Sequence, residues 1–327
     1  MQLSRHRYAV IGIFIALVVV AVLYYVLPRV NLAYILNPTG NLTVVEILAI
    51  AFVLGLLHGI TPDEHTWPIT FSYAVGSYST RKGMKAGFSF SLGFTAQRAF
   101  LTTLGFLGLA TFYKTYNLDG PVYVLVGIAM TVVGMYILNK RLDLHIPLDK
   151  LFGSEHHTGR SERKPMHDVR PRVAVVHGLI AGFGFGAYAT IITFILAPHV
   201  PSLLYAPLVG VMFGLGTMVM QIVFGAIFAN FARLRNLSES QVKHVGRKTA
   251  GRTLLYGGIA FAVIGALVIA FPAIDQLALS TGNSIPNLDS IGVSTVLVLL
   301  VVGVIGIGSL IRGFGEMLSL SHGRRRK

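Results

Sequence analysis

Residues 44–78 read VVEILAIAFVLGLLHGITPDEHTWPITFSYAVGSY, two apolar stretches joined by a short polar segment. That segment holds His58, Asp63, Glu64 and His65 within eight residues. A membrane helix needs about 20 apolar residues, so the whole stretch is long enough to cross a bilayer. Pro62 lacks a backbone N–H and favours an extended conformation in the residue before it. The stretch therefore predicts a membrane-spanning helix that is interrupted near Pro62.

The apolar residues of the rest of the chain also fall into long blocks. Of the 327 residues, 54% are hydrophobic and only 12% are charged. This pattern predicts an all-α, polytopic membrane protein with about eight transmembrane helices. The expected spans are residues 8–28, 44–78 (interrupted), 83–112, 121–139, 172–197, 204–231, 253–272 and 292–314.

The positive charge, a net +14, lies mostly between the apolar blocks. Lys and Arg gather in alternate gaps, at residues 81–85, 140–172 and 233–252, and at both ends of the chain, whereas the other gaps hold only Arg29 and Lys114. Cytoplasmic loops retain Lys and Arg. We therefore expect a multi-pass plasma-membrane protein with both termini in the cytoplasm. The lipid bilayer, and not nucleic acid, is the expected partner of the charges.

Two classes of chemistry are excluded by residues that the sequence lacks. There is no cysteine, so a metal site must use nitrogen and oxygen ligands. There is also no glycine-rich phosphate-binding loop ending in Lys-Ser or Lys-Thr, so no nucleotide energy source is expected. No resident cofactor is predicted.

Short internal similarities suggest a repeat. Residues 57–59 (LHG) resemble 176–178 (VHG), and residues 90–93 (FSLG) resemble 213–216 (FGLG). Since the second span runs inward and the fifth outward, the two units form an inverted repeat of three-helix units, an arrangement typical of transporters. The expected organisation is 1–30, an N-terminal transmembrane helix; 44–139, the first unit; 140–171, a cytoplasmic loop; 172–272, the second unit; and 292–327, the last helix with a basic tail.

The loop at 140–171 holds four histidines, and two interpretations of them stay open. His145, His156, His157 and His167 could collect metal at low affinity, or they could belong to an ordinary solvated loop.

The polar segment of the second span carries the predicted chemistry. Ionisable residues at membrane depth are costly and mark functional sites by default. Imidazole and carboxylate ligands suit first-row divalent cations, so His58, Asp63, Glu64 and His65 are predicted to bind a metal ion. A structural alternative is a capping box with Thr61 at the cap and Glu64 three residues later. The two interpretations are compatible, since a helix that is broken inside the membrane exposes backbone groups and side chains to an ion in many transporters.

Further polar residues within spans are expected to line a substrate pathway. They are Thr61, Gln97, Arg98, His177 and Gln221. An unpaired Arg98 side chain within the membrane would be energetically costly, and Asp63 or Glu64 is its expected ion-pair partner. Alternatively, Arg98 binds an anionic substrate directly.

At these residues the chain resembles the nickel/cobalt transporter families within the lysine-exporter superfamily. The second-helix motif of those families is similar to His58, Asp63 and His65, and the third- and fifth-helix signatures resemble residues 87–93 and 182–185. The resemblance implies eight helices, a long central cytoplasmic loop and nickel or cobalt as the transported ion. Three family positions differ, because a histidine and two acidic residues are replaced by Phe94, Gly186 and a residue near Gly216.

Three functions follow from these patterns. The leading hypothesis is a secondary transporter of a divalent transition-metal cation, nickel or cobalt first, and no enzyme activity. The second is an exporter of an anion or small organic acid that uses Arg98 and the helix amino terminus near Thr61. The third is an intramembrane metalloenzyme. The zinc-protease motif with two histidines around a glutamate on one helix is absent, which disfavours the third.

Overall fold

The computed structural model describes residues 32–37, 40–116, 118–139, 166–168, 170–235 and 237–325, and the statements below concern these residues. The predicted first span at 8–28 and residues 140–165 of the central loop lie outside them, together with His145, His156 and His157. His167 is described, and its ring stacks on Tyr136 with 4.4 Å between the centroids.

The described chain is built of helices, and the prediction of an all-α fold is confirmed. In order, its main elements are α2 (Leu32–Leu36), α3 (Val44–Ile60), α4 (Trp67–Ser77), α5 (Thr80–Phe106), α6 (Phe112–Thr115), α7 (Asp119–Leu138), α9 (Pro171–Ala181), α10 (Ala187–Thr190), α11 (Ala206–Phe231), α12 (Glu239–Ala270), α13 (Val293–Val298) and α14 (Gly308–Arg325). Short turns η3 (Leu109–Thr111) and η6 (Pro272–Gln276) follow α5 and α12. Helix α10 continues through the π-helical η4 (Ile191–Leu196) into η5 (Ala197–His199), and α13 continues through η7 (Leu299–Ile307) into α14.

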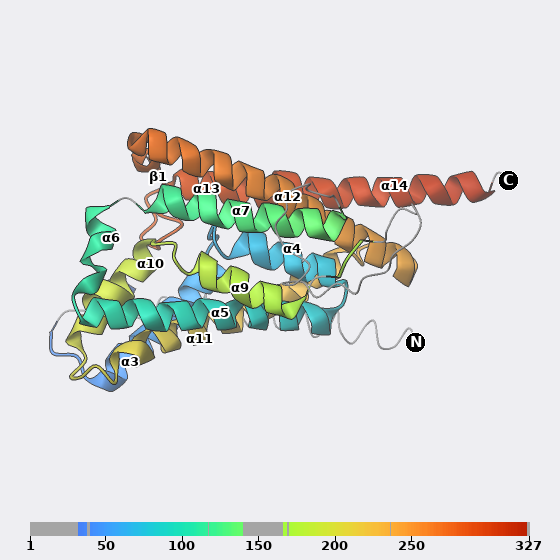
Figure 1. Cartoon of the computed structure of the whole chain (residues 1–327). Coiled ribbons are helices and arrows are strands. Elements are labelled where there is room, and N and C mark those ends of the chain that lie inside the picture. Colours follow the sequence, from blue (N-terminus) through green and yellow to red (C-terminus); the bar gives the residue numbers. More distant parts are fainter. Residues whose placement is uncertain are drawn as a thin grey trace, which may run out of the picture.

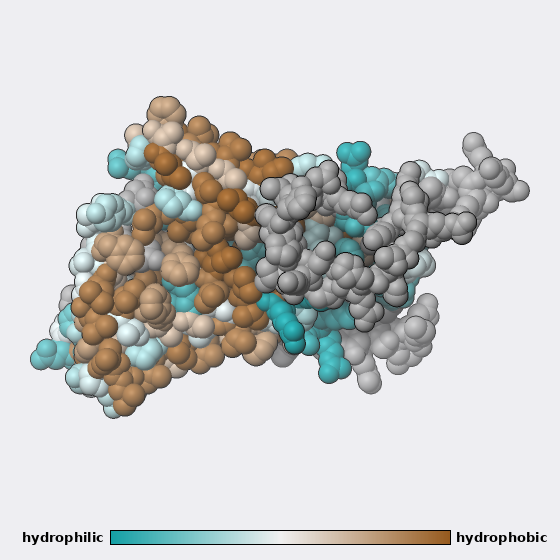
Figure 2. Space-filling view, viewed as in Figure 1, coloured by the Kyte–Doolittle hydropathy of each residue, from teal (hydrophilic) through white to brown (hydrophobic). Residues whose placement is uncertain are grey.

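The helices are compatible with a membrane protein. Four are long and apolar enough to cross a bilayer, namely Asp119–Leu138, Ala206–Phe231, Glu239–Ala270 and Val293–Met317. Shorter apolar helices cover Val44–Ile60, Pro171–Ala181 and Ala187–His199. Figure 2 shows hydrophobic residues over much of one face of the helical body. Large apolar side chains of the helices, such as Phe88, Leu92 and Val263, are exposed. Such extensive apolar exposure is expected of a surface that contacts lipid.

Two spans are broken, one in each predicted three-helix unit. The break between α3 and α4 was predicted from Pro62. The fifth span was expected to be continuous over 172–197, but α9 ends at Ala181 and α10 begins at Ala187. Gly182, Gly184 and Gly186 lie in this gap. Glycine has about 1 kcal/mol less helix propensity than alanine, which explains why the helix gives way there.

The broken helices pack closely on two of the long helices. Helix α9 contacts α5, and α3 contacts α11, while α5 and α11 also pack on each other and α7 packs on α12. The crossings are close, because a Cβ added at Gly178 would lie 1.8 Å from the carbonyl oxygen of Phe90, and one at Gly55 would lie 2.0 Å from that of Phe213. Helix α9 therefore packs closely on α5, and α3 packs closely on α11.

Basic side chains meet at one end of the bundle, which we call the basic end. Lys82 and Lys243 lie over the ring of Tyr78, 4.8 and 5.7 Å from its centroid, and Arg233 Nε donates to the Tyr78 carbonyl at 3.0 Å. Helix α14 projects from this end (Figure 1). The helices at the predicted seventh and eighth spans extend beyond the predicted bounds. Helix α12 begins at Glu239, after a Ser238 capping box, and α14 continues to Arg325.

A short two-stranded hairpin lies at the opposite end, which we call the hairpin end. Strand β1 (Leu279–Ser280) pairs antiparallel with β2 (Ser290–Ile291), with Leu279 opposite Ile291. The sequence predicted only a loop between the last two spans. Helix α6 and the start of α7 lie at the same end (Figure 1).

Candidate metal centre

The break in the second span follows from the Thr61-Pro62 pair. Thr61 is extended, with φ −75° and ψ 144°, as expected for a residue before proline. Its backbone N–H and its hydroxyl both donate to the Leu57 carbonyl, at 3.0 and 2.9 Å, so Thr61 closes the last turn of α3. Helix α3 thus ends at Ile60, two residues after His58.

Asp63, and not Thr61, caps the turn that leads into α4. Asp63 Oδ1 accepts from the backbone N–H groups of His65 at 3.1 Å and Thr66 at 2.9 Å. The predicted capping box from Thr61 to Glu64 is therefore wrong. The reason is that α4 begins only at Trp67, so Thr61 closes the preceding helix instead. One oxygen of Asp63 is used by the backbone, and Oδ2 is left for other partners.

Three side chains of this turn gather closely enough to hold one metal ion. Asp63, Glu64 and His65 each offer a ligand atom, and these atoms all lie within 4.8 Å of one another. The side chains are only 7%, 8% and 5% exposed. A buried group of two carboxylates and one imidazole is costly unless a cation or other partners compensate it, and nitrogen and oxygen donors suit first-row divalent metals.

The Glu64 carboxylate is held from three directions. Its Oε1 lies 3.0 Å from His65 Nδ1 and accepts from the Tyr123 hydroxyl at 3.3 Å, and its Oε2 accepts from the Ser294 hydroxyl. His65 Nε2 has no hydrogen-bond partner among the described residues. A carboxylate on one imidazole nitrogen that leaves the other nitrogen open is the usual arrangement behind a metal-binding histidine. Glu64 therefore acts at least as the group that orients His65.

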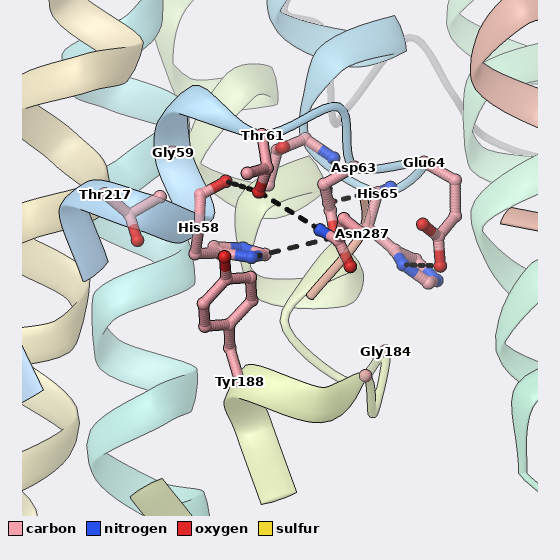
Figure 3. A network of polar contacts seen from close by, with 12 residues as sticks. His58, Gly59, Thr61, Asp63, Glu64, His65, Gly184, Tyr188, Thr217 and Asn287 are labelled. Atoms are coloured by element: carbon pink, nitrogen blue, oxygen red, sulfur yellow. Dashed lines mark hydrogen bonds and ion pairs between the residues drawn. The ribbon is translucent and has the colours of Figure 1, made fainter. Parts of the chain in front are cut away.

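His58 approaches the cluster from the other side of Asp63 (Figure 3). Its Nδ1 lies 3.8 Å from Asp63 Oδ2, too far for a hydrogen bond, and neither ring nitrogen has a hydrogen-bond partner within the described part of the chain. The ring is enclosed by Phe94, Tyr188 and Phe213, at centroid distances of 5.4, 5.5 and 5.2 Å. Buried polar atoms are normally paired, so this gap between an imidazole and a carboxylate favours a bound cation.

The break of the fifth span lies against the same cluster. A Cβ added at Gly184 would lie 2.5 Å from His65 Cε1, so the imidazole rests directly on this glycine. Arg98 Nη2 donates to the Gly184 carbonyl at 2.9 Å, and its guanidinium lies over the ring of Phe94 at 4.6 Å. Gln97 contacts the neighbouring Gly182. The expected pairing of Arg98 with Asp63 or Glu64 stays a prediction.

The other two predicted pathway residues lie apart from this cluster. Gln221 is buried, and its Nε2 donates to the Gly59 carbonyl at 3.4 Å, beside His58 in the chain. His177 is buried in α9 and is hydrogen-bonded through Nδ1 to the Tyr73 hydroxyl of α4.

Residues from the hairpin end complete the site, and the sequence did not reveal them. Asn287 Nδ2 donates to the Thr61 hydroxyl at 3.4 Å, as Figure 3 shows, and the Tyr188 hydroxyl donates to the Pro286 carbonyl at 3.3 Å. Ser294 and Tyr123 bind Glu64, as described above. A carboxylate predicted to be buried needs hydrogen-bond donors, so the sequence indicates that such donors exist. It does not identify them, because a donor such as Ser294 lies 230 positions from Glu64 in the chain.

The chain has no match among protein-family models, curated proteins or solved structures. The resemblance to nickel/cobalt transporters therefore stays a prediction from the motif residues.

Gly184→Ala tests whether the two breaks form one site. The added Cβ would displace the His65 ring, and we expect the affinity for nickel or cobalt to fall about tenfold, the effect typical of disturbing a ligand's support. Gly186→Ala is the matched control, because no atom lies within 4 Å of a Cβ there. Metal titration calorimetry of the purified protein in detergent measures both variants. Equal losses of metal affinity in Gly184→Ala and Gly186→Ala would contradict the contact of Gly184 with His65 at the metal centre.

Proposed function

We propose that this protein is a secondary transporter of a divalent transition-metal cation, with nickel and cobalt the first candidates. The observation that supports this most directly is the buried cluster of Asp63, Glu64 and His65 at a helix break, with His58 facing Asp63. Broken helices at membrane depth are where secondary transporters bind ions.

The packing supports the proposed inverted repeat. One unit would comprise α3 to α7 and the other α9 to α12, each with a broken first helix followed by two long helices. Each broken helix packs on the middle helix of the opposite unit, which is the exchange that a two-fold axis in the membrane plane would produce. The two breaks then meet near that axis, where Gly184 contacts His65.

The charge distribution supports the proposed orientation. Lys82, Arg233 and Lys243 converge on Tyr78 at the basic end, which would face the cytoplasm of a plasma-membrane protein. Eight spans, with both termini on that side, remain part of the proposal. The hairpin end would then face outward, with Asn287 and Pro286 lying over the site.

Metal flux into proteoliposomes tests the proposed function. Vesicles with a metal-quenched dye inside should respond to external nickel or cobalt when they contain the wild-type protein. His58→Ala should abolish the response because it removes the imidazole that faces Asp63. His199→Ala is a control, since His199 is exposed in η5. No flux for any member of a panel of divalent metals would contradict the proposal.

A further inference from the structure

One buried histidine lies outside the metal centre and is not explained by it. Among the described residues, the buried histidine and carboxylate side chains are His58, Asp63, Glu64, His65 and His177. The first four belong to the candidate metal centre. His177 is 2% exposed and lies in α9, five residues before Gly182 at the break.

The partner of His177 suits a group that gains and loses a proton. Its Nδ1 is hydrogen-bonded to the hydroxyl of Tyr73, which is fully buried. A tyrosine hydroxyl is both a donor and an acceptor, so it can accept from a protonated Nδ1 and donate to a deprotonated one. The bond therefore survives either state of the imidazole, and no buried polar atom on this side of the ring is left unpaired.

Apart from Tyr73, the surroundings of His177 come from helices α5 and α7. From α7, the backbone of Ala129 approaches the ring. From α5, the carbonyl of Phe90 lies against the adjacent Gly178. No charged side chain forms an ion pair with His177 in the described part of the chain. The cations of α5 lie at its basic end, at residues 81–85, except for Arg98, which binds the Gly184 carbonyl.

The position of His177 connects it to both the basic end and the metal centre. Helices α4 and α9 each run between the basic end and one of the two breaks, and the Tyr73–His177 bond joins these two half-helices. After α9 ends at Ala181, the chain continues through the break to Gly184, which contacts His65. A change in the charge of His177 can therefore act on the packing of α4 against α9 without displacing a metal ligand.

We propose that His177 is the binding site for a coupling proton, whose uptake and release drive metal transport through the Tyr73–His177 contact. This inference rests on the proposed function. Intramembrane histidines serve such proton-relay roles in other transporters.

Two assays on the same proteoliposomes separate the proton site from the metal site. The first is exchange of labelled cobalt for internal cobalt at equal pH, which needs the metal site and no coupling proton. The second is net cobalt accumulation driven by an acid-inside pH gradient. In His177→Gln, which keeps a polar side chain beside Tyr73, accumulation is expected to fall about tenfold or more while exchange stays close to wild type. His244→Gln, a half-buried histidine of α12, is the control and should keep both activities.

The outcomes are distinct. Gradient-driven accumulation that persists in His177→Gln would overturn the proton site, and so would equal losses of exchange and accumulation in a correctly folded variant. Tyr73→Phe removes this hydrogen bond, so it should reduce gradient-driven accumulation and shift the pH of half-maximal accumulation while exchange continues. Wild-type accumulation with an unchanged pH profile would count against the Tyr73–His177 contact. Absence of exchange in the wild type would instead refute the proposed metal transport.

Discussion

Replacing Asp63 by Asn is expected to abolish metal binding while leaving the break between α3 and α4 intact. The amide oxygen of Asn can still accept from the backbone N–H groups of His65 and Thr66, which Asp63 Oδ1 now binds. The charge at Oδ2, which faces His58, is lost. We expect at least about a 100-fold fall in metal affinity, as for removal of a ligand rather than of its support.

Asp63→Ala separates the two roles of this side chain. It removes the cap as well as the charge, so the free energy of unfolding should fall by about 1 kcal/mol more than in Asp63→Asn. Calorimetric metal titration and thermal unfolding in detergent measure the two effects. Asp289→Asn serves as the control, because Asp289 is an exposed carboxylate of the hairpin end. Wild-type affinity in Asp63→Asn would remove Asp63 from the metal centre.

The break itself could be predicted from the sequence, whereas its capping could not. Proline restricts the backbone of the residue before it whatever the tertiary packing, so Thr61-Pro62 indicates the end of α3 from the sequence alone. The start of α4 depends on tertiary packing as well, and the match of Thr61 and Glu64 to a capping box was misleading. The helix begins at Trp67, whose ring packs on Phe224 of α11 with 4.9 Å between the centroids.

The candidate ligands were likewise visible in the sequence, since ionisable residues at membrane depth stand out locally. Their supports were not, because they come from distant helices. Phe94 illustrates this, since the family resemblance gives a histidine at its position. The structure stacks the Phe94 ring on His58, at an angle of 12° between the planes. The position does belong to the site, yet it supplies an apolar wall and no nitrogen ligand.

The relative effects of His65→Ala and Arg98→Lys are expected to distinguish a cation site from an anion site. For a cation, His65→Ala should reduce metal transport about 100-fold, because it removes a ligand whose Nε2 has no hydrogen-bond partner among the residues that the structure describes. Arg98→Lys should have a smaller effect. Its guanidinium hydrogen-bonds the Gly184 carbonyl, and a lysine keeps the charge while losing the planar geometry of that contact.

For an anion substrate the order reverses, because Arg98 would bind the substrate and His65 would not. Both variants can be compared in proteoliposomes, with cobalt in one series and small organic acids in the other. Folding is verified by size-exclusion chromatography, since Arg98 is buried and its substitution can disturb the Gly184 break. A greater loss in Arg98→Lys than in His65→Ala, together with flux of an organic acid, would refute cation transport. The reverse order, together with cobalt flux, would support a cation site that includes His65.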